Sequence, residues 1–240
     1  MPYAILRIEK LKQSQIQRAL QHNHRERIPL NSNPDLLSRN HYYGTPNEAL
    51  NRIEILKEQT QEATGRKVRR DANVAVEVLL TASPSFFVFR KNMKTEKFAE
   101  QAIAWVKAEF GAHRILSMAL HRDERTPHLH IFLLPEVEEK LNCKAFIGGH
   151  RDRLSRLQDR FSKAMAPLGL KRGNPKRGVH HTTIREWYAQ RLNDDKTLQR
   201  LKRKLGAALR ENEQAKEYIK LLEKRIAEYE ARLGGPRELY

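Results

Sequence analysis

Alternating apolar and polar positions mark the predicted strands of this chain. A strand over 74–80 is indicated by β-branched residues with a period of two. Val74, Val76 and Val78 would lie on one of its faces, and Ala75, Glu77 and Leu79 on the other. Similar runs predict strands over 3–8, 114–121 and 128–134, and a weaker one near 141–147.

Apolar positions three and four residues apart predict helices between these strands. The predicted helices cover 14–21 with Ser14 as N-cap, 47–63 ended by Gly65, 95–110 followed by Gly111, and about 151–165. Their apolar stripes are Leu50, Ile53, Ile55 and Leu56; Phe98, Ala102, Trp105, Val106 and Phe110; and Leu154, Leu157, Phe161 and Met165. Residues 22–50 are polar and proline-containing, which predicts a long loop or a set of short turns.

Hairpin-linked strands with helices inserted between them predict an α+β fold built on an antiparallel sheet. A chain of 240 residues can bury a sizeable core, so we expect one domain with an appendage. No glycine-rich nucleotide-binding motif is present in the sequence, and we therefore expect no nucleotide cofactor.

The appendage begins near Lys196, where apolar residues repeat every seven positions. One seam position is occupied by Leu198, Leu205, Asn212, Ile219, Ile226 and Leu233, and the other by Leu201, Ala208, Ala215, Leu222 and Tyr229. This pattern predicts a coiled-coil tail over 196–233 that makes the protein a homodimer. In a parallel pair, Glu211 would meet the partner's Lys216 and Arg225 the partner's Glu230. The alternative is a lone helix folded back on the domain.

The charge of the chain indicates its partner. Lys and Arg number 46 against 29 Asp and Glu, a formal net charge of +17. The excess is clustered in the segment Arg66-Lys67-Val68-Arg69-Arg70 and in residues 150–177. Because such a surplus repels itself in a compact fold, a polyanion is the expected partner, and we predict nucleic acid.

Other features exclude whole classes of protein. The single cysteine, Cys143, rules out an intramolecular disulfide and a cysteine-based zinc knuckle. No segment has the roughly 18 apolar residues of a membrane span, and the first ten residues lack a secretory apolar region. We therefore expect a cytoplasmic protein without a membrane span.

Three histidines carry the main chemical signal. His128 and His130 are two residues apart, so their imidazoles leave the same face of a strand. His121 ends the preceding apolar run, and a hairpin between the two runs would bring the three imidazoles together. Nitrogen donors without a thiolate favour Zn, Mn, Co or Ni, with room left for a substrate oxygen. Asp123 and Glu124 would lie on the connecting loop.

These motifs resemble those of a known family. The stretch HRDERTPHLHIFLLP (121–135) resembles the signature of the Mob/Pre plasmid mobilisation proteins, the MobV group of relaxases within the HUH endonucleases. His22-Asn23-His24-Arg25, Ser38-Arg39-Asn40-His41-Tyr42-Tyr43 and the segments 141–149 and 154–159 resemble further motifs of that family. The similarity covers roughly 1–190. One departure is Gly44, which stands where the family usually has an acidic residue.

The resemblance implies an HUH relaxase-like fold over 1–190 and a DNA relaxase. Such an enzyme nicks one strand at a plasmid transfer origin, stays attached to the 5′ phosphate through a histidine, and later rejoins the strand. It implies His22 as nucleophile, Glu124 as the carboxylate that orients or deprotonates it, and His121, His128 and His130 as ligands of a divalent metal, Mn or Mg. Arg25 would lie near the scissile phosphate, and Asn40 and Tyr43 would shape the DNA site.

The residues themselves leave alternatives open. Tyr42 and Tyr43 are rival nucleophiles, and without the resemblance His22 would be interpreted as a surface histidine of a polar loop. A metal-dependent nuclease that uses water would also fit, as would a non-enzymatic dimeric DNA-binding protein with a structural metal site. From the charge pattern we expect Arg70, Arg153, Arg156 and Arg160 to contact DNA.

Overall fold

The computed structural model describes residues 2–29, 31–88, 91–148, 152–173 and 184–232. Its contacts divide the chain into two compact units, Met1–Arg177 and Gly178–Tyr240. The first unit contains β1 (Tyr3–Lys12), α1 (Gln13–Asn23), β2 (His41–Tyr43), α2 (Pro46–Thr64), β3 (Asn73–Ala82), α3 (Lys91–Phe110), β4 (Ile115–His121), β5 (His128–Leu133), β6 (Glu136–Val137), β7 (Lys140–Leu141), α4 (Cys143–Ile147), α5 (Arg153–Met165) and β8 (Lys171–Arg172). Short 3-10 helices cover Pro34–Arg39, Pro84–Phe87, Ala112–Arg114 and Ala166–Leu168.

A six-stranded sheet with the order β2-β4-β5-β3-β1-β8 forms the centre of the first unit. All neighbouring pairs in it are antiparallel except β1 and β8, which are parallel. Strands β6 and β7 form a separate small hairpin. The expected α+β fold with inserted helices is confirmed.

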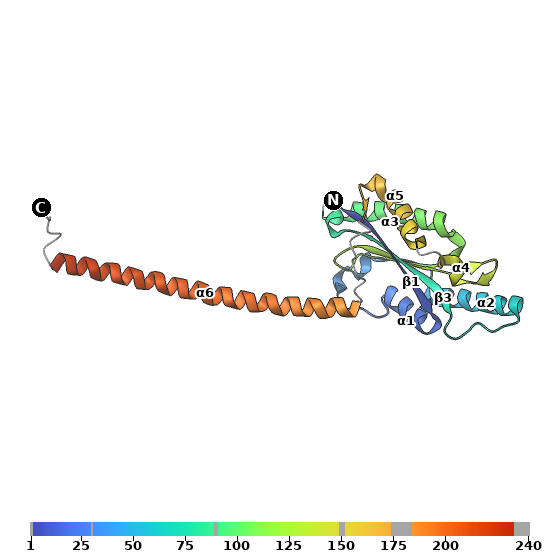
Figure 1. The fold of residues 1–240 in the computed structure, drawn as a ribbon, viewed down its shortest axis with the longest axis horizontal. Coiled ribbons are helices and arrows are strands. Elements are labelled where there is room, and N and C mark those ends of the chain that lie inside the picture. The colour runs from blue at the N-terminus through green and yellow to red at the C-terminus, as the bar shows by residue number, and fades with distance from the viewer. Residues whose placement is uncertain (1, 30, 89–90, 149–151, 174–183, 233–240) are drawn as a thin grey trace. The chain divides into compact units, whose positions relative to one another are not determined.

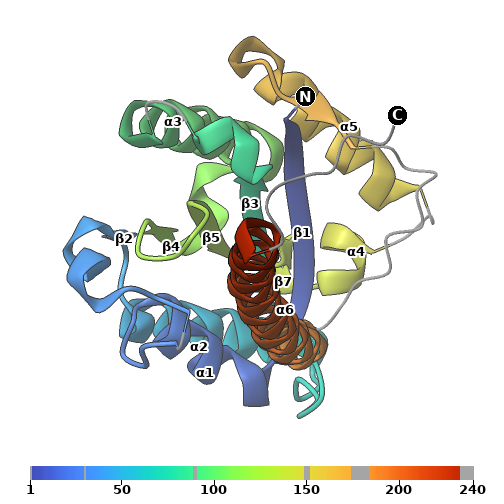
Figure 2. The same cartoon turned by 90° about the vertical axis from the view of Figure 1, so that its left-hand side faces the viewer.

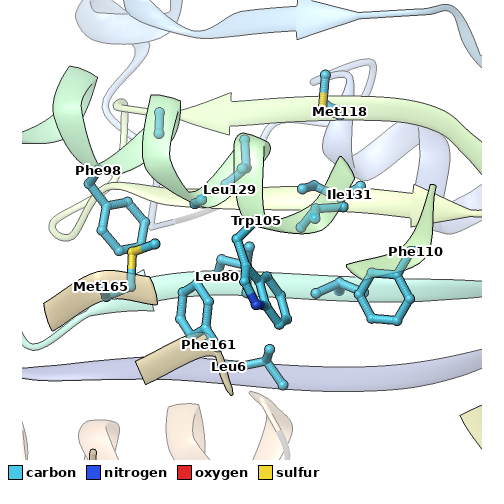
Figure 3. Packing of buried hydrophobic residues seen from close by; sticks show 14 of the residues in the cluster. Leu6, Leu80, Phe98, Trp105, Phe110, Met118, Leu129, Ile131, Phe161 and Met165 are labelled. Carbon is cyan, nitrogen blue, oxygen red and sulfur yellow. The ribbon is translucent and has the colours of Figure 1, made fainter. Parts of the chain in front are cut away.

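Two helical layers cover the two faces of this sheet. Helices α3 and α5 lie on one face and α1 and α2 on the other (Figure 2). On the first face Trp105 packs against Phe161, with ring centroids 4.9 Å apart, above the strand residues Leu80 and Ile131 (Figure 3). The second face has a smaller core. It consists of Leu11, Ile16, Leu20, Ala49, Ile53, Leu56, Val74, Ala75, Leu116, Phe132 and Leu134.

Local sequence signals explain several element boundaries. Helix α2 begins after Thr45, whose hydroxyl accepts the Glu48 N–H while the Glu48 carboxylate accepts the Thr45 N–H. It ends at Gly65, which adopts a left-handed conformation with φ of 65°. The predicted stripe of α3 is buried throughout. In α5, however, Leu154 is exposed, and in α2 so is Ile55, because each lies outside the arc that faces the sheet.

Three local predictions were wrong. Helix α1 begins at Gln13 and not after Ser14, because β1 runs directly into it and the Lys12 N–H donates to the Gln15 side chain. The expected strand near 141–147 is largely helix α4, whose N-cap Asn142 accepts the Ala145 N–H at 3.0 Å. Within the expected loop over 22–50, the short edge strand β2 pairs with β4.

The second unit is described from Ile184 to Arg232 as one continuous helix, α6 (Figure 1). The seam residues Leu205, Ile219, Ile226 and Tyr229 are each more than half exposed within this unit. Leu233 and the segment Gly234-Gly235-Pro236 lie outside the described residues. A long C-terminal helix is confirmed, whereas its pairing with a second copy stays a prediction. Among the described helices, none is long and apolar enough to cross a membrane.

Candidate metal centre and nucleophile site

Strands β4 and β5 bring the three predicted histidines together. His121 pairs with His128 and Ala119 with His130, so the three imidazoles lie on one face of the hairpin. Their ring centroids are 4.9 to 5.0 Å apart. One nitrogen from each ring lies within 4.8 Å of the other two. The cluster expected from the sequence therefore exists, and its geometry can hold a metal ion.

The outer nitrogen of each ring has a hydrogen-bond acceptor. Nε2 of His121 lies 2.8 Å from the Asn23 carbonyl oxygen, and Nδ1 of His128 lies 2.9 Å from the Thr126 carbonyl oxygen. Nδ1 of His130 lies 2.6 Å from Oε1 of Glu77. Because a neutral imidazole has a single N–H, these acceptors assign that hydrogen to the outer nitrogen of each ring.

The three inner nitrogens therefore face a common volume, and in neutral rings with this tautomer they are the acceptors. Nδ1 of His121 and Nε2 of His128 lie 3.2 Å apart. Burial lowers the pKa of His121 to about 2, and burial lowers the pKa of His130 well below its usual value. Neutral imidazole is the form that binds metal, so the donor set fits a borderline divalent cation with coordination positions left open.

Glu124 and Arg25 form an ionic network beside this cluster. Arg25 donates from Nε and Nη2 to the two Asp123 oxygens at 2.8 and 2.9 Å, and Nη2 also donates to Oε1 of Glu124 at 2.7 Å. Asn31 donates to the other Glu124 oxygen at 2.6 Å, and Oε1 of Glu124 lies 3.8 Å from Nε2 of His128. The Glu124 carboxylate on the hairpin loop is thus fixed by two residues of the segment that follows α1, Arg25 and Asn31.

His22 lies in the last turn of α1, and its interpretation as a residue of a polar loop was wrong. The helix holds it near the cluster because Ile16 and Leu20 are fully buried in the core beneath it. Burial lowers the pKa of His22, and Arg25 lowers it further, while Glu124 and Glu77 oppose this. Arg25, Glu124, Glu77 and His128 therefore lie near enough to His22 to influence the charge of its ring.

Asn40 and the two tyrosines have different positions. The Asn40 side-chain oxygen accepts the backbone N–H groups of Arg122 and Asp123 at 2.7 and 3.2 Å, which holds the hairpin loop. Tyr42 pairs with Ala119 and therefore lies on the same face as the histidines, where it stacks on His24 with centroids 5.4 Å apart. Tyr43 pairs with Met118 and lies on the opposite face.

The four predicted DNA-contacting arginines lie away from the cluster. Arg70 is exposed and precedes β3, whose other end pairs with His128. Arg153, Arg156 and Arg160 belong to α5, which covers the other face of the sheet. Arg153 donates to the carbonyl oxygens that end α4, Arg160 pairs with Glu109, and Arg156 is exposed.

Two residues of the site were not predicted from the sequence. Glu77 was placed on the correct face of its strand, and a lone carboxylate within an apolar strand is the signal that could have found it. Asn23 was named only as part of a motif. Nothing in its spacing indicates that its carbonyl and amide groups reach two different strands.

A mixed sheet that presents three histidines at one hairpin defines this unit as a relaxase-like fold. It superimposes on the crystal structure of the MobM relaxase domain bound to plasmid pMV158 oriT DNA with Mn at pH 5.5, with a TM-score of 0.69 and 26% identity over 78% of this chain and 99% of that chain. A second Mn-bound MobM structure with 23-nucleotide oriT DNA gives a TM-score of 0.68 and 25% identity over 79% and 98%.

The family follows from the sequence comparisons. The model of the plasmid recombination enzyme family, Mob_Pre, matches residues 1–189, and the chain belongs to this family. A 65 kDa protein of Zymomonas mobilis is 31% identical over 82% of this chain and 34% of its own length, and a plasmid recombination enzyme of a Bacillus species is 29% identical over 81% and 48%. The chain thus spans about a third to a half of the length of these relatives.

Proposed function

We propose that the chain nicks and rejoins one strand of plasmid DNA at a transfer origin, using a divalent metal and a covalent 5′-phosphoryl histidine at His22. The observation that carries the proposal is the cluster of three inner imidazole nitrogens beside a half-buried histidine. Membership in the plasmid recombination enzymes supports it. So does the fold shared with a relaxase domain that was crystallised with Mn and oriT DNA.

His22 is suited to nucleophilic attack because its lowered pKa keeps the ring neutral near pH 7. One ring nitrogen forms a bond to the scissile phosphorus, the bond from phosphorus to the 3′ oxygen breaks, and that oxygen takes a proton from solvent. The other ring nitrogen then gives its proton to the Glu124 carboxylate, which leaves a phosphoramidate with a neutral imidazole ring and one negative charge on its phosphoryl oxygens. Attack by the 3′ hydroxyl reverses each step and rejoins the strand.

The three histidines would hold a divalent ion, Mn or Mg, through Nδ1 of His121 and Nε2 of His128 and His130. Such an ion acts as a Lewis acid that neutralises charge on the non-bridging oxygens of the scissile phosphate. Arg25 would support this chemistry indirectly, because its guanidinium forms ion pairs that hold the carboxylates of Glu124 and Asp123 in place. We assign it to positioning Glu124 in addition to any contact with the phosphate.

DNA would approach the end of this sheet face at which the cluster lies, beside the last turn of α1. The exposed edge strand β2 borders this face and offers Tyr42, while Asn40 holds the loop that carries Glu124. Tyr43, together with the exposed Arg70 and Arg156, would contact more distant DNA, and Arg153 and Arg160 would do so only by leaving their internal partners. The net charge of +17 supplies the long-range attraction.

The seam of α6 supports a parallel two-stranded homodimer. Its apolar residues are exposed in the described part of the helix, and Asn212 occupies a seam position where a polar side chain favours two strands in register. The domain over 1–190 would carry the relaxase activity and the tail over 196–233 the dimer contact. A cytoplasmic location is part of the same proposal.

A second candidate function is a dimeric DNA-binding protein in which the metal is structural. A structural zinc site is normally closed by four protein ligands, whereas the described residues gather three histidines around the candidate centre. This difference favours the enzyme.

The experiment that separates the two functions uses the full chain, supercoiled plasmid carrying a transfer origin of this family, and Mn²⁺. We expect relaxed circles with protein bound to a 5′ end, and none after chelation. His128→Ala should lose nicking but keep its DNA affinity, because lysines and arginines supply the attraction. Equal loss of binding and nicking in folded His128→Ala would instead favour the structural metal.

A further inference from the structure

Asn23 is the last residue of α1 and follows His22 directly. It is only 1% exposed. Its backbone carbonyl oxygen accepts the Nε2–H of His121 at 2.8 Å, and its side-chain Nδ2 donates to Oε1 of Glu77 at 2.8 Å. The same Glu77 oxygen accepts the Nδ1–H of His130 at 2.6 Å. Asn23 is therefore connected to two of the three histidines. Its backbone carbonyl contacts His121 directly, and its side-chain amide reaches His130 through Glu77.

These contacts select the atoms that face the metal volume. The carbonyl of Asn23 requires the hydrogen on Nε2 of His121, which leaves Nδ1 without a hydrogen and able to bind a metal ion. Glu77, held by the Asn23 amide, requires the hydrogen on Nδ1 of His130 and leaves Nε2 inside. His128 is held differently, by the carbonyl of Thr126 in its own hairpin loop.

We propose that Asn23 is a positioning residue that couples the His22-bearing end of α1 to the metal centre, with Glu77 as the connecting carboxylate. The inference rests on the proposed function, since it takes the three histidines as metal ligands and His22 as the nucleophile. It adds a reason why nucleophile and metal would keep a fixed separation. The end of α1 cannot shift without breaking hydrogen bonds to His121 and to Glu77, the carboxylate that accepts the His130 hydrogen.

Glu77 connects α1 to the metal centre through a single oxygen atom. Its side chain is 14% exposed, and its Oε1 accepts both the Asn23 amide hydrogen and the Nδ1–H of His130. Without the Asn23 amide, this oxygen loses the contact from α1 that holds it beside His130. Carboxylate partners of metal-binding histidines fix the ring orientation and the tautomer, and such outer residues typically change metal affinity about 10- to 100-fold when removed.

The test uses the full chain and Asn23→Leu, which removes the amide donor at similar size and keeps the backbone carbonyl. Mn²⁺ affinity is measured by titration calorimetry. We expect binding to weaken about 10-fold, the lower end of the range for outer residues of metal sites. The matched control is Asn31→Leu, which removes an amide donor from Glu124, a carboxylate that lies 3.8 Å from His128 but is not hydrogen-bonded to the outer nitrogen of a cluster histidine. Its Mn²⁺ affinity should equal that of the unchanged chain.

A second measurement reports tautomers without metal. In ¹⁵N NMR spectra of the histidine rings, the metal-free wild type should show Nε2–H for His121 and Nδ1–H for His130. Asn23→Leu should keep the His121 signal, because the carbonyl remains, and should give a mixture of tautomers for His130. Glu77→Gln keeps an acceptor oxygen beside Asn23 and His130. The double variant Asn23→Leu with Glu77→Gln should weaken Mn²⁺ binding by less than the product of the two single effects.

The outcomes separate this inference from the function on which it rests. If wild type binds no Mn²⁺, the proposed metal function fails. If wild type binds Mn²⁺ and Asn23→Leu binds it equally well with an unchanged His130 tautomer, the coupling by Asn23 is overturned while the metal function stands. If Asn23→Leu does not fold, Asn23→Ala is measured instead with the same two readouts.

Discussion

Gly44 holds a backbone conformation that a residue with a side chain would strain. Its φ is +70°, and a Cβ built there would lie 2.8 Å from the carbonyl oxygen of Leu116. The acidic residue that the resemblance places at this position therefore does not fit the present backbone. The carboxylates beside the cluster, Glu77, Asp123 and Glu124, come from other strands and loops.

We predict that Gly44→Ala is markedly less stable than the matched variant Gly65→Ala. Gly65 is also left-handed, with φ of +65°, but nothing lies within 4 Å of its Cβ position. Gly65→Ala should cost about 1–2 kcal/mol for the backbone conformation alone, and Gly44→Ala should cost more because of the added clash. Urea unfolding of both variants measures the difference. Equal losses would contradict the steric explanation.

At the residue scale, the sequence predicted what depends on local spacing. The positions of His128 and His130 on one strand face, and of His121 at the hairpin end, follow from strand periodicity. Asn23, Glu77 and the network of Arg25 depend on contacts between segments far apart in the chain, and no local pattern contains them. Which of Tyr42 and Tyr43 lies on the same face as the histidines also depends on the register of β2 against β4.

At the element scale, long periodic segments and the two hairpin strands β4 and β5 were predicted correctly, whereas the short elements α4 and β2 were not. The stripe of α3 and the alternation over 75–80 in β3 bury enough apolar surface to determine their structure. The expected face of Val74 was wrong: it packs in the same core as Ala75 and not with Val76 and Val78, beside an irregularity in the pairing of β1 with β3. Helix α4 has five residues, and its apolar content resembles that of a strand, so only its Asn142 cap distinguishes it. Strand β2 has three exposed residues and exists because β4 offers it an edge.

The tail gives a prediction about a single seam position. The full chain should be dimeric. The Asn212→Leu variant should associate more tightly but form species larger than a dimer, because a polar seam residue that favours a two-stranded coiled coil is lost. The control is Glu217→Leu, which adds the same apolar side chain outside the seam and should stay dimeric. Light scattering over a range of concentrations measures both variants. A full chain that is monomeric at every concentration would refute the coiled coil.

At the scale of the whole molecule, the titrating groups set how stability depends on pH. Burial lowers the pKa values of His22, His24, His121 and His130, so below pH 6.5 the unfolded chain binds more protons than the folded chain. The raised pKa of Glu77 acts in the opposite direction, but it is a single group.

We therefore predict that the free energy of unfolding of the metal-free protein falls between pH 7 and pH 5.5. Each histidine that stays neutral in the folded state contributes about 1.4 kcal/mol per pH unit once the unfolded form is protonated. Urea unfolding in the presence of a chelator measures this. The added stability from Mn²⁺ should shrink over the same range, because protons compete with the metal for imidazole. Constant or rising stability toward acid would place these histidines in solvent.

The most direct test of the central claim identifies the atom that carries the DNA. The trapped protein–DNA adduct is digested, and the DNA-linked peptide is analysed by mass spectrometry before and after brief treatment with mild acid. A phosphorus–nitrogen bond breaks when the imidazole is protonated and survives alkali, whereas a phosphotyrosine withstands both. We predict an acid-labile adduct on His22 that also forms with Tyr42→Phe and Tyr43→Phe and is absent with His22→Ala. An acid-stable adduct on Tyr42 or Tyr43, or nicking without any adduct, would contradict a histidine nucleophile.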